Sequence, residues 1–353
     1  DLEQLGLVIP ADEVFPETMI IVAEKGRDDT VLRYRTHYPE PSVSERLLRK
    51  QFSERGFPVI DRQTVADAGG YAEGNAPYNL EMHYDALYRL KSATYRDTGS
   101  GDIRRKMTYS YDHIGNILSR QTLNSDLEPN PEEEFYDKWF SAATFDPAHP
   151  HRVTSVNGDA GQIASLEYDA NGNVTQLRVE NPVTDTDIVY EYEWDHYNRL
   201  VTAKKSRVVG NGNGNSGPPP EVIAEYRYDL GNQRVVKAEI VGNQLKTAYY
   251  VTEGYEIRSD TEVLYIFGQE KRLARIDGTG IRTFTNDHLG STATIAAWNG
   301  NVFSTTSHLP FGAIEAETGA LDEPYKFTGK ELERNFGLYY FGARYLNPQL
   351  GRW

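Results

Sequence analysis

Short runs in which apolar and polar residues alternate dominate the chain from about residue 77 onward. In residues 190–195, for example, aromatic side chains at even positions alternate with carboxylates at odd positions. A period of two residues is the pattern of a half-buried β-strand. Each run ends in turn residues, and an apolar residue such as Ile117, Val174 or Leu200 begins the return strand. The pattern predicts a chain of antiparallel β-hairpins.

One short motif recurs five times along these hairpins: an aromatic residue, an aspartate, a turn and an apolar residue. Its members are Tyr84 and Asp85, Tyr111 and Asp112, Tyr168 and Asp169, Trp194 and Asp195, and Tyr228 and Asp229, with turn glycines at Gly115, Gly172 and Gly231. An aspartate at a strand end can accept hydrogen bonds from backbone N–H groups two residues on. Glycine or asparagine then adopts the left-handed conformation that a reversal needs. One such hairpin has too little core to stand alone, so we expect the units to stack on their neighbours.

The aspartates of the five motifs lie 27, 57, 26 and 34 residues apart. Two interruptions lengthen the second and fourth intervals, and we interpret both as loops at hairpin ends. Residues 125–151 are acidic and rich in proline, and in residues 210–220 glycine and asparagine alternate before three prolines. Without these loops the period is about 26–30 residues, which is typical of stacked repeat architectures.

The first 75 residues follow a different pattern. A helix is predicted to begin at Ser42, because Ser42 and Glu45 match a capping box and an apolar stripe follows them. Basic residues near its end and a glycine at Gly56 are typical of a helix C-terminus. We expect this helix to cover one end of a sheet.

The composition supports a β-rich chain and narrows the possible functions. Tyrosine (24) outnumbers phenylalanine (13), and glycine is abundant (30), as expected for strands joined by tight turns. The 353 residues include no cysteine, which excludes disulfides and thiolate chemistry. The net charge of −15 argues against nucleic-acid binding. No apolar run is long enough to span a membrane and no signal peptide is visible, and we expect the chain to be a fragment.

Two features of the chain match a known family. The five motifs resemble the YD repeats of Rhs proteins, of the C component of Tc-type insecticidal toxins and of teneurins. In the order and spacing of its motifs, the C-terminal quarter resembles the Rhs-associated core segment. The matching positions include Asp287, Gly290, Pro310, Gly312, Gly329, Gly337, Tyr339, Arg344, Gly351 and Arg352. The resemblance covers roughly residues 80–353.

This resemblance implies a mainly β fold, with a minor helical N-terminal part, in which a strip of hairpins curves into a hollow shell. It implies that the shell encloses a C-terminal toxin domain, that the core segment closes one end, and that the family's aspartyl self-cleavage site lies beyond Trp353. We therefore expect a structural module of a secreted or cell-surface bacterial toxin, without a catalytic residue, metal or cofactor of its own. Its expected partners are the toxin cargo and the remaining shell repeats, in the same polypeptide or in another chain.

The same reasoning divides the chain into three segments and leaves two other functional classes open. The segments are residues 1–75, the YD repeats at 76–258 and the core segment at 259–353. A cell-surface module could instead bind carbohydrate or protein through exposed aromatic residues, for which the run at 337–345 is a candidate. We favour packing of these aromatic side chains at the end of the shell, with Arg344 and Arg352 as partners for nearby carboxylates. An enzyme would require self-cleavage residues beyond Trp353.

Several short motifs match catalytic or binding signatures only in part. Residues 212–217 match G-x-G-x-x-G, but three prolines follow where a dinucleotide site needs a helix. Residues 327–330 end like a P-loop but lack its first glycine. Residues 169–180 begin and end like a calcium loop, but Val174 stands at the position of its glycine. We interpret all three as turns or loops.

Two further groups have suitable residue types but unsuitable spacing. Asp146, His149 and His151 could offer metal ligands, although an H-x-H pair alone is a weak signal, and we expect a solvated loop. Asp287, His288 and Ser291 are the residue types of a hydrolase triad. Neighbours within one turn do not easily adopt the relay geometry of a triad, so we expect turn residues there as well.

Overall fold

The computed structural model describes most of the chain from residue 78 to the C-terminus. The described residues are 20–25, 30–35, 78–97, 100–123, 140–158, 161–180, 186–209, 218–268, 271–287, 289–297, 300–319 and 323–353. Within these ranges the regular structure consists of β-strands and two short 3-10 turns, so the predicted mainly β class is confirmed. The helix predicted from Ser42 and the glycine–asparagine stretch at 210–217 lie outside the described residues.

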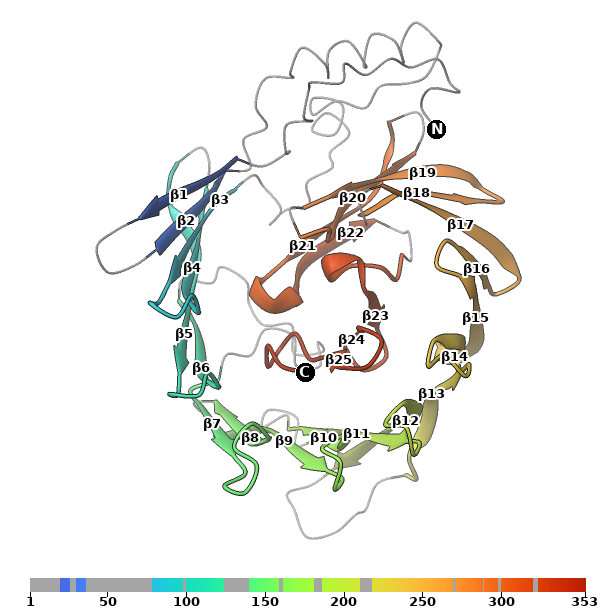
Figure 1. Cartoon of the computed structure of the whole chain (residues 1–353), viewed down its shortest axis with the longest axis horizontal. Helices are drawn as coiled ribbons and strands as arrows, with labels where there is room; N and C mark the ends of the chain where they lie inside the picture. The colour runs from blue at the N-terminus through green and yellow to red at the C-terminus, as the bar shows by residue number, and fades with distance from the viewer. Residues whose placement is uncertain are drawn as a thin grey trace, which may run out of the picture. The chain divides into compact units, whose positions relative to one another are not determined.

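The strands form three sheets in which neighbours in the sequence are neighbours in the sheet (Figure 1). The first sheet contains β1 (Ile20–Lys25), β2 (Thr30–Arg35), β3 (Tyr78–Tyr84), β4 (Leu90–Asp97), β5 (Ile103–Tyr111) and β6 (Ile117–Leu123). The second, of sixteen strands, contains β7 (Ala142–Phe145), β8 (Val153–Gly158), β9 (Gly161–Tyr168), β10 (Val174–Val179), β11 (Thr186–Trp194), β12 (Leu200–Val209), β13 (Glu221–Tyr228), β14 (Arg234–Val241), β15 (Gln244–Thr252), β16 (Tyr255–Arg258), β17 (Thr261–Gly268), β18 (Lys271–Asp277), β19 (Gly280–Asn286), β20 (Thr292–Ala297), β21 (Val302–His308) and β22 (Ile314–Gly319). The third contains β23 (Glu331–Glu333), β24 (Leu338–Tyr340) and β25 (Tyr345–Leu346). The 3-10 turns are η1 (Pro310–Gly312) and η2 (Phe327–Gly329).

The chain divides into two compact units. Unit 1 consists of Asp1–Arg105, Tyr265–Pro310 and Ile314–Lys330, and unit 2 consists of Lys106–Leu264, Phe311–Ala313 and Glu331–Trp353. Each unit is therefore assembled from segments that lie far apart in the sequence.

In unit 2 the strands β6–β16 bend into an arc, and the short strands β23–β25 lie on its inner side (Figure 1). Ala203 and Ala224, which pair across β12 and β13, are 0% and 2% exposed. Beside them the buried Tyr192 ring meets the Phe336 ring edge to face, with the centroids 5.5 Å apart. The hairpins of unit 2 thus bury one face against the C-terminal segment, residues 331–353.

Strands β14–β16 reverse the usual placement of polar and apolar residues. On their buried face stand the charged residues Arg234, Lys237 and Glu256, which are only 5%, 2% and 1% exposed. On the opposite face of β15, Tyr249 and Val251 are 45% and 54% exposed. A rule that places apolar residues inside assigns the faces of these strands the wrong way round.

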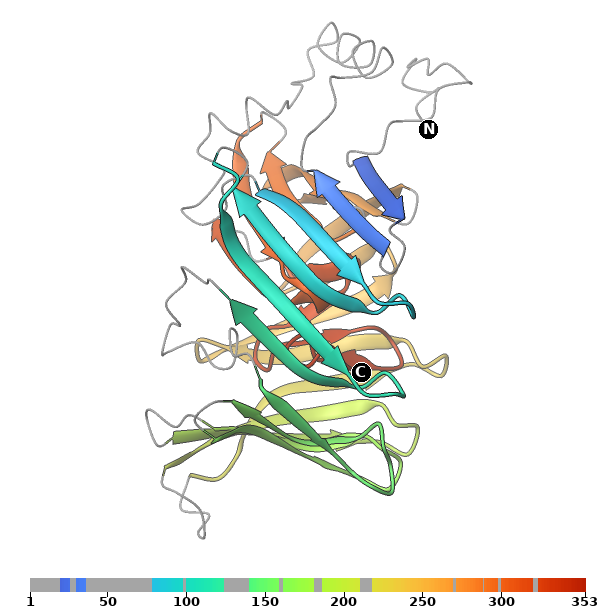
Figure 2. The ribbon, with the colours of Figure 1, turned by 90° about the vertical axis from the view of Figure 1, so that its left-hand side faces the viewer.

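Part of the segment that the sequence assigns to a loop is a hairpin. Residues 142–145 form β7, which pairs antiparallel with β8, and Phe140 makes a backbone bridge to Arg120. The loop is therefore shorter than residues 125–151. In Figure 2 the turn from β7 to β8 lies at the same edge as the turn from β5 to β6.

In unit 1 the strands β18–β22 bury both apolar and polar groups. Phe284 and Ile295 pair across β19 and β20 and are 7% and 0% exposed. Lys326 directly precedes η2 and Glu323 lies three residues before Lys326; both side chains are 0% exposed. No helix in the part of the chain that the structure describes is long and apolar enough to cross a membrane.

Candidate functional site

Each aspartate of the repeated motif organises a tight turn through its backbone and its carboxylate. In the first turn the Asp85 N–H donates to the Arg89 carbonyl, and the Tyr88 N–H donates to the Asp85 carbonyl, both at 2.9 Å. Asp85 Oδ1 also accepts the N–H groups of Leu87 and Arg89, both at 2.9 Å. The same pair of backbone hydrogen bonds closes the turns at Asp112, Asp169, Asp195 and Asp229. This is the turn chemistry that the sequence motif predicts.

The fourth residue of each turn adopts the left-handed conformation. Glycine takes this place twice, at Gly115 (φ 92°) and Gly172 (φ 93°). In the turn after Tyr228, the left-handed residue is Asn232 (φ 63°) and not the predicted Gly231. In the first turn it is Tyr88 (φ 60°). Since a bulky residue rarely adopts this conformation, the hydrogen bonds to the aspartate must hold it there.

Hydrogen bonds in the turn lower the carboxylate pKa of Asp85, Asp112, Asp169 and Asp195. Burial by itself raises the pKa of Asp195, but hydrogen bonds from the side chain and N–H of Arg199 and from the Tyr197 N–H outweigh it and lower this pKa. The contact from Arg199 Nε to Asp195 Oδ2 measures 2.7 Å. In two other turns, Asn116 and Asn173 donate from their side-chain amides to the equivalent oxygen at 2.6 and 2.8 Å.

In the third, fourth and fifth motifs, the aromatic residue before the aspartate joins one hairpin to the hairpin before it. The Tyr168 hydroxyl donates to the Val153 carbonyl at 2.8 Å. Trp194 Nε1 donates to the Val174 carbonyl at 2.7 Å, and the Tyr228 hydroxyl donates to the Leu200 carbonyl at 2.8 Å. In each case the acceptor is the first residue of the preceding return strand. The motif therefore supplies a cross-link between repeats as well as a turn.

Hydrogen bonds also connect neighbouring turns along their edge of unit 2. The side-chain amides of Asn171 and Asn173 both donate to Asn198 Oδ1 at 2.9 Å. Arg199 Nη1 donates to the Asp229 carbonyl at 3.2 Å and to Asn232 Oδ1 at 3.0 Å. The third and fourth turns are thus each fixed to the next turn along the chain.

Two more turns of the same kind escape the sequence pattern. Asp146 Oδ1 accepts the Ala148 N–H at 2.8 Å, and the Asp146 N–H donates to the Arg152 carbonyl at 2.9 Å. Asp287 makes the full set of contacts, since its Oδ1 accepts the N–H groups of Leu289 and Ser291 at 2.9 and 2.7 Å. The turn at Asp146 is lengthened by two prolines, and the turn at Asp287 follows Asn286 in place of an aromatic residue.

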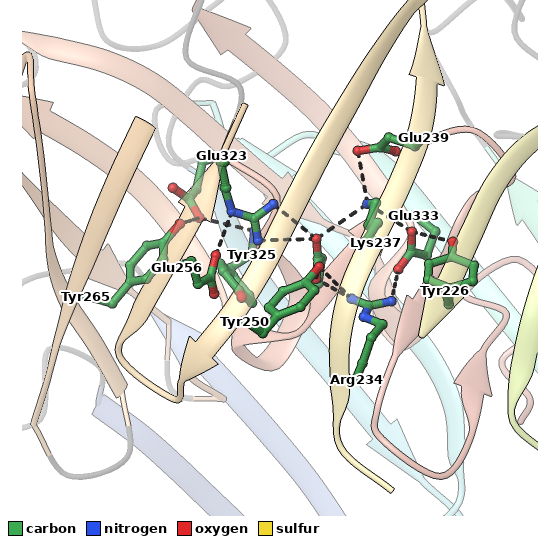
Figure 3. A network of polar contacts seen from close by, with 12 residues as sticks. Tyr226, Arg234, Lys237, Glu239, Tyr250, Glu256, Tyr265, Glu323, Tyr325 and Glu333 are labelled. Carbon is green, nitrogen blue, oxygen red and sulfur yellow. Dashed lines mark hydrogen bonds and ion pairs between the residues drawn. The ribbon is translucent and has the colours of Figure 1, made fainter. Parts of the chain in front are cut away.

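The C-terminal segment brings two carboxylates into a buried cluster of cations and tyrosines in unit 2 (Figure 3). Glu333 accepts Arg234 Nη1 at 2.5 Å and Lys237 Nζ at 3.0 Å. Glu331 pairs with Arg234 Nη2, lies 3.4 Å from Lys237 Nζ and pairs with Arg258 Nη2 at 3.3 Å. The side chains of both glutamates and of Arg234 and Lys237 are at most 2% exposed.

Tyrosines surround the same cluster. The hydroxyl of Tyr226 donates to Glu333 at 2.8 Å, and that of Tyr250 donates to Glu331 at 2.7 Å. The Arg234 guanidinium lies over the rings of Tyr340, Tyr250 and Tyr226, with its carbon 3.9, 5.0 and 5.2 Å from their centroids. Burial, followed by the charge of Glu333, raises the pKa of Tyr226 well above its usual value. Tyr226 is therefore a stable hydrogen-bond donor.

The predicted core positions Gly312, Gly337 and Tyr339 lie together in unit 2. The Tyr339 side chain is 0% exposed, and its hydroxyl donates to the Gly312 carbonyl at 3.0 Å. Gly337 has a φ of 73°, and its N–H donates to the Glu333 carbonyl at 2.7 Å. Tyr345 is only 8% exposed, so two tyrosines of the run at 337–345 pack inside the unit and do not offer a sugar-stacking surface.

The predicted core position Arg352 is fixed at the turn edge of unit 2. Its Nη2 donates to Asn116 Oδ1 at 2.9 Å and to the His151 carbonyl at 2.7 Å. Asn116, 2% exposed, also accepts His151 Nδ1 at 3.0 Å and donates to the Pro150 carbonyl at 2.8 Å. Arg352 therefore binds an amide and a carbonyl at the place where two turns meet, and not the carboxylate that the sequence suggested.

The neighbouring core positions Arg344 and Gly351 make simpler contacts. The exposed Arg344 guanidinium lies 5.1 Å from the centroid of the Trp353 ring. Gly351 has a φ of 63°, and a Cβ placed there would lie 3.0 Å from Ile117 and 3.1 Å from Phe311. A side chain at this position would be strained and crowded.

The remaining core positions lie in unit 1. Pro310 begins η1. The segments that contain Gly290 and Gly329 pack together, because the Thr328 N–H donates to Ser291 Oγ at 3.1 Å and the Thr292 N–H to the Lys326 carbonyl at 3.0 Å. A Cβ on Gly329 would lie 3.6 Å from the Gly290 carbonyl oxygen.

The candidate metal ligands and triad residues have structural partners. His149 Nδ1 lies 2.9 Å from Asp146 Oδ2, while His151 turns away to Asn116. Ser291 receives its hydrogen bond from a backbone N–H, and His288 lies outside the described residues. In the described ranges, no group of three or more histidine, aspartate or glutamate side chains is arranged to hold a metal ion.

The chain is a distant homologue of bacterial toxin proteins. It is 24% identical over 279 residues to the tRNA3(Ser)-specific nuclease WapA of Bacillus spizizenii, a match that covers 76% of the chain and 10% of that protein. It is 23% identical over 327 residues to the toxin subunit YenC1 of Yersinia entomophaga, a match that covers 76% of the chain and 30% of YenC1. It is 23% identical over 380 residues to the double-stranded DNA deaminase toxin A of Burkholderia cenocepacia, covering 94% and 24%. The predicted resemblance to Rhs and Tc toxin proteins is thus confirmed at the level of distant homology.

The chain spans between a tenth and a third of the length of these relatives, at 10%, 30% and 24%. A solved structure of the TcdB2–TccC3 complex is 17% identical and has a TM-score of 0.38, over 78% of this chain and 17% of that one. No family model matches the chain.

Proposed function

We propose that this chain, a distant homologue of WapA and of a Tc toxin subunit, is a wall module of a toxin shell. Its hairpins form part of a wall around a C-terminal effector, and residues 331–353 are an end piece fixed to the inside of that wall. The observation that carries this proposal is the packing of the C-terminal segment on the inner face of the hairpins in unit 2 (Figure 1). Because residues 331–353 already cover this inner face, we interpret the hairpins as a wall that encloses other parts of the polypeptide.

A scaffold accounts for the charged residues better than a catalytic site does. Glu331 and Glu333 are buried and engaged by cations and tyrosine hydroxyls. The turn aspartates are likewise engaged by backbone N–H groups. A catalytic acid or base must reach its substrate, whereas these groups are occupied within the fold. We therefore assign no catalytic step to this chain.

The partners follow from the same proposal. The nuclease and deaminase activities in the names of the relatives belong to much longer proteins, and we assign them to parts that this chain does not correspond to. The chain would then act with an effector and with further repeats, in a secreted or cell-surface toxin. The buried Tyr339 and Tyr345 make carbohydrate binding at the run 337–345 the weaker alternative.

Protease protection tests the proposal. The complete natural polypeptide that contains this chain should be digested with a nonspecific protease while the region after Trp353 is followed by mass spectrometry. We expect that region to survive in the native protein and to be digested at least tenfold faster once the wall is unfolded by denaturant. Digestion at the same rate in both states would overturn the proposal.

A further inference from the structure

The two glutamates of β23 are buried in a part of unit 2 that a simpler fold would fill with apolar residues. Moving an ion out of water costs several kcal/mol, and a buried pair repays this only when its geometry is good and its remaining hydrogen bonds are satisfied. Here both conditions are met, since each glutamate has two or more cations and a tyrosine hydroxyl as partners. Replacing such a cluster by apolar residues is often neutral or stabilising, whereas removing one partner is strongly destabilising because it leaves a buried charge uncompensated.

We propose that Glu331 and Glu333 form a charged clasp that holds the C-terminal segment on unit 2 in one register and keeps it closed in acid. The proposal concerns how the segment is attached, and it stands whether or not the parent protein encloses an effector.

The geometry of β23 favours a single register of the C-terminal segment. Glu331 and Glu333 point to one face of the strand, and Leu332, which is 5% exposed, points to the other. A shift by one residue would exchange the two faces of the strand. The Leu332 side chain would then lie among the cations, and both carboxylates would lie in the apolar environment of Leu332. A shift by two would leave a single carboxylate in the cluster, so both Arg234 and Lys237 would lose one of their two carboxylate partners. Each alternative leaves buried charge without a partner, which is strongly destabilising.

The groups around Glu331 explain why its contacts in the clasp resist acid. Glu331 faces Arg234 and Lys237 of β14, Tyr250 of β15 and Arg258 of β16. Burial by itself raises the pKa of Glu331, but the charges of Lys237, Arg234 and Arg258 outweigh it and hold this pKa well below its usual range. A carboxylate whose pKa is lowered by folding contributes stability above its unfolded pKa and loses it only as the pH falls through the folded value. The contact therefore persists at pH values at which ordinary glutamates are protonated.

Two other carboxylates border the cluster and must be considered. Glu239 lies 3.1 Å from Lys237 Nζ, and burial, together with the charges of Glu333 and Glu331, raises its pKa. Glu239 is thus protonated before Glu331 on acidification. Glu256 pairs with Arg258 Nε at 2.6 Å. Protonation of Glu239 removes no contact of Glu331, which keeps Arg234, Lys237 and Arg258 as partners.

Hydrogen exchange of the full chain between pH 7.5 and pH 4 tests the clasp. Exchange rates, corrected for intrinsic pH dependence, should be compared between peptides from 331–346 and from the β13–β14 hairpin of the same unit. We expect the C-terminal peptides to lose protection together with the hairpin and not before it. Opening of the segment at a higher pH than the hairpin would refute the acid-resistant clasp.

Two variants and a control separate the clasp from general destabilisation. In Glu331→Gln we expect exchange of 331–346 to rise at least tenfold at pH 7.5, with little change at the Asp195 turn. If that variant fails to fold, Arg258→Gln, at the cluster's edge, should fold and shift opening of the segment to a higher pH than in the natural protein. Glu193→Gln removes an exposed ion pair with Lys204. This control should change neither the exchange of 331–346 at pH 7.5 nor the pH at which the segment opens. Unchanged protection in both clasp variants would overturn the proposal.

Discussion

Removal of the Asp195 carboxylate tests the turn chemistry on which the whole repeat depends. In Asp195→Ala, Oδ1 no longer accepts the N–H groups of Tyr197 and Arg199, which it binds at 2.9 and 3.1 Å. The variant also loses the contacts of Oδ2 with Arg199 at 2.7 Å. Hydrogen bonds to a charged group contribute about 1.5–3 kcal/mol each, but the turn is partly exposed and water can replace some of them. We expect a net loss of about 2–3 kcal/mol in the stability of this hairpin.

Asp187 offers a closely matched control. Its side chain is 18% exposed, as is that of Asp195, and it also pairs with an arginine, Arg178, at 2.7 Å. Its carboxylate, however, supports no turn. Exposed ion pairs contribute about 0–1 kcal/mol, so Asp187→Ala should cost much less than Asp195→Ala.

Hydrogen exchange measures the difference locally. A loss of about 2 kcal/mol corresponds to roughly 30-fold faster exchange of the amides in the β11–β12 hairpin. Asp195→Asn, which keeps one acceptor oxygen, should lie between the alanine variant and the natural protein. Equal effects of Asp195→Ala and Asp187→Ala would refute the reasoning, because the ion pair alone would then explain the contribution of the turn.

Three further predictions concern other parts of the fold. Trp194→Phe removes the donor to the Val174 carbonyl and should lower the free energy of unfolding by about 1 kcal/mol, with faster exchange in β10. An unchanged denaturation midpoint would contradict a cross-linking role for Trp194. Gly319→Ala should disrupt the β21–β22 pairing, because the new Cβ would lie 1.9 Å from the Phe303 carbonyl oxygen, and normal protection of these strands would argue against that approach. Desolvation, together with the charge of Lys326, lowers the pKa of His308 to about 3, so the native state keeps this imidazole neutral while the unfolded chain binds a proton. Stability should fall with decreasing pH below about 6.5, by about 1.4 kcal/mol per pH unit from this group, and His308→Gln but not His149→Gln should remove that slope in urea titrations.

The local features of the hairpins could be predicted from the sequence because neighbouring residues determine them. Alternation with a period of two gives the strands, and an aspartate followed by a left-handed residue gives the turn. Asp146 escaped this reasoning because prolines in its turn resemble those of an irregular loop. Asp287 was correctly predicted as a turn residue, but it was not grouped with the repeated turns because no aromatic residue precedes it.

The buried cluster could not be predicted, because its contacts join residues that are distant in the sequence. Arg234 and Glu331 are separated by 97 positions, and Tyr226 and Glu333 by 107. Nothing local distinguishes Arg234 or Lys237 from the lysines and arginines of a solvated strand face. Only the structure shows that these strands carry buried charged residues on one face and exposed apolar residues on the other.

The position of the C-terminal segment on the inner face of unit 2 is the central claim, and cross-linking tests it most directly. Because the chain has no cysteine, two can be introduced without competing thiols. Asn335 Nδ2 lies 3.5 Å from Glu239 Oε2, so Asn335→Cys with Glu239→Cys should react with a short bismaleimide to form an internal cross-link. The pair Asn335→Cys with Tyr249→Cys, on the outer face of β15, should remain unlinked. Equal cross-linking of the two pairs, or none in either, would contradict the account.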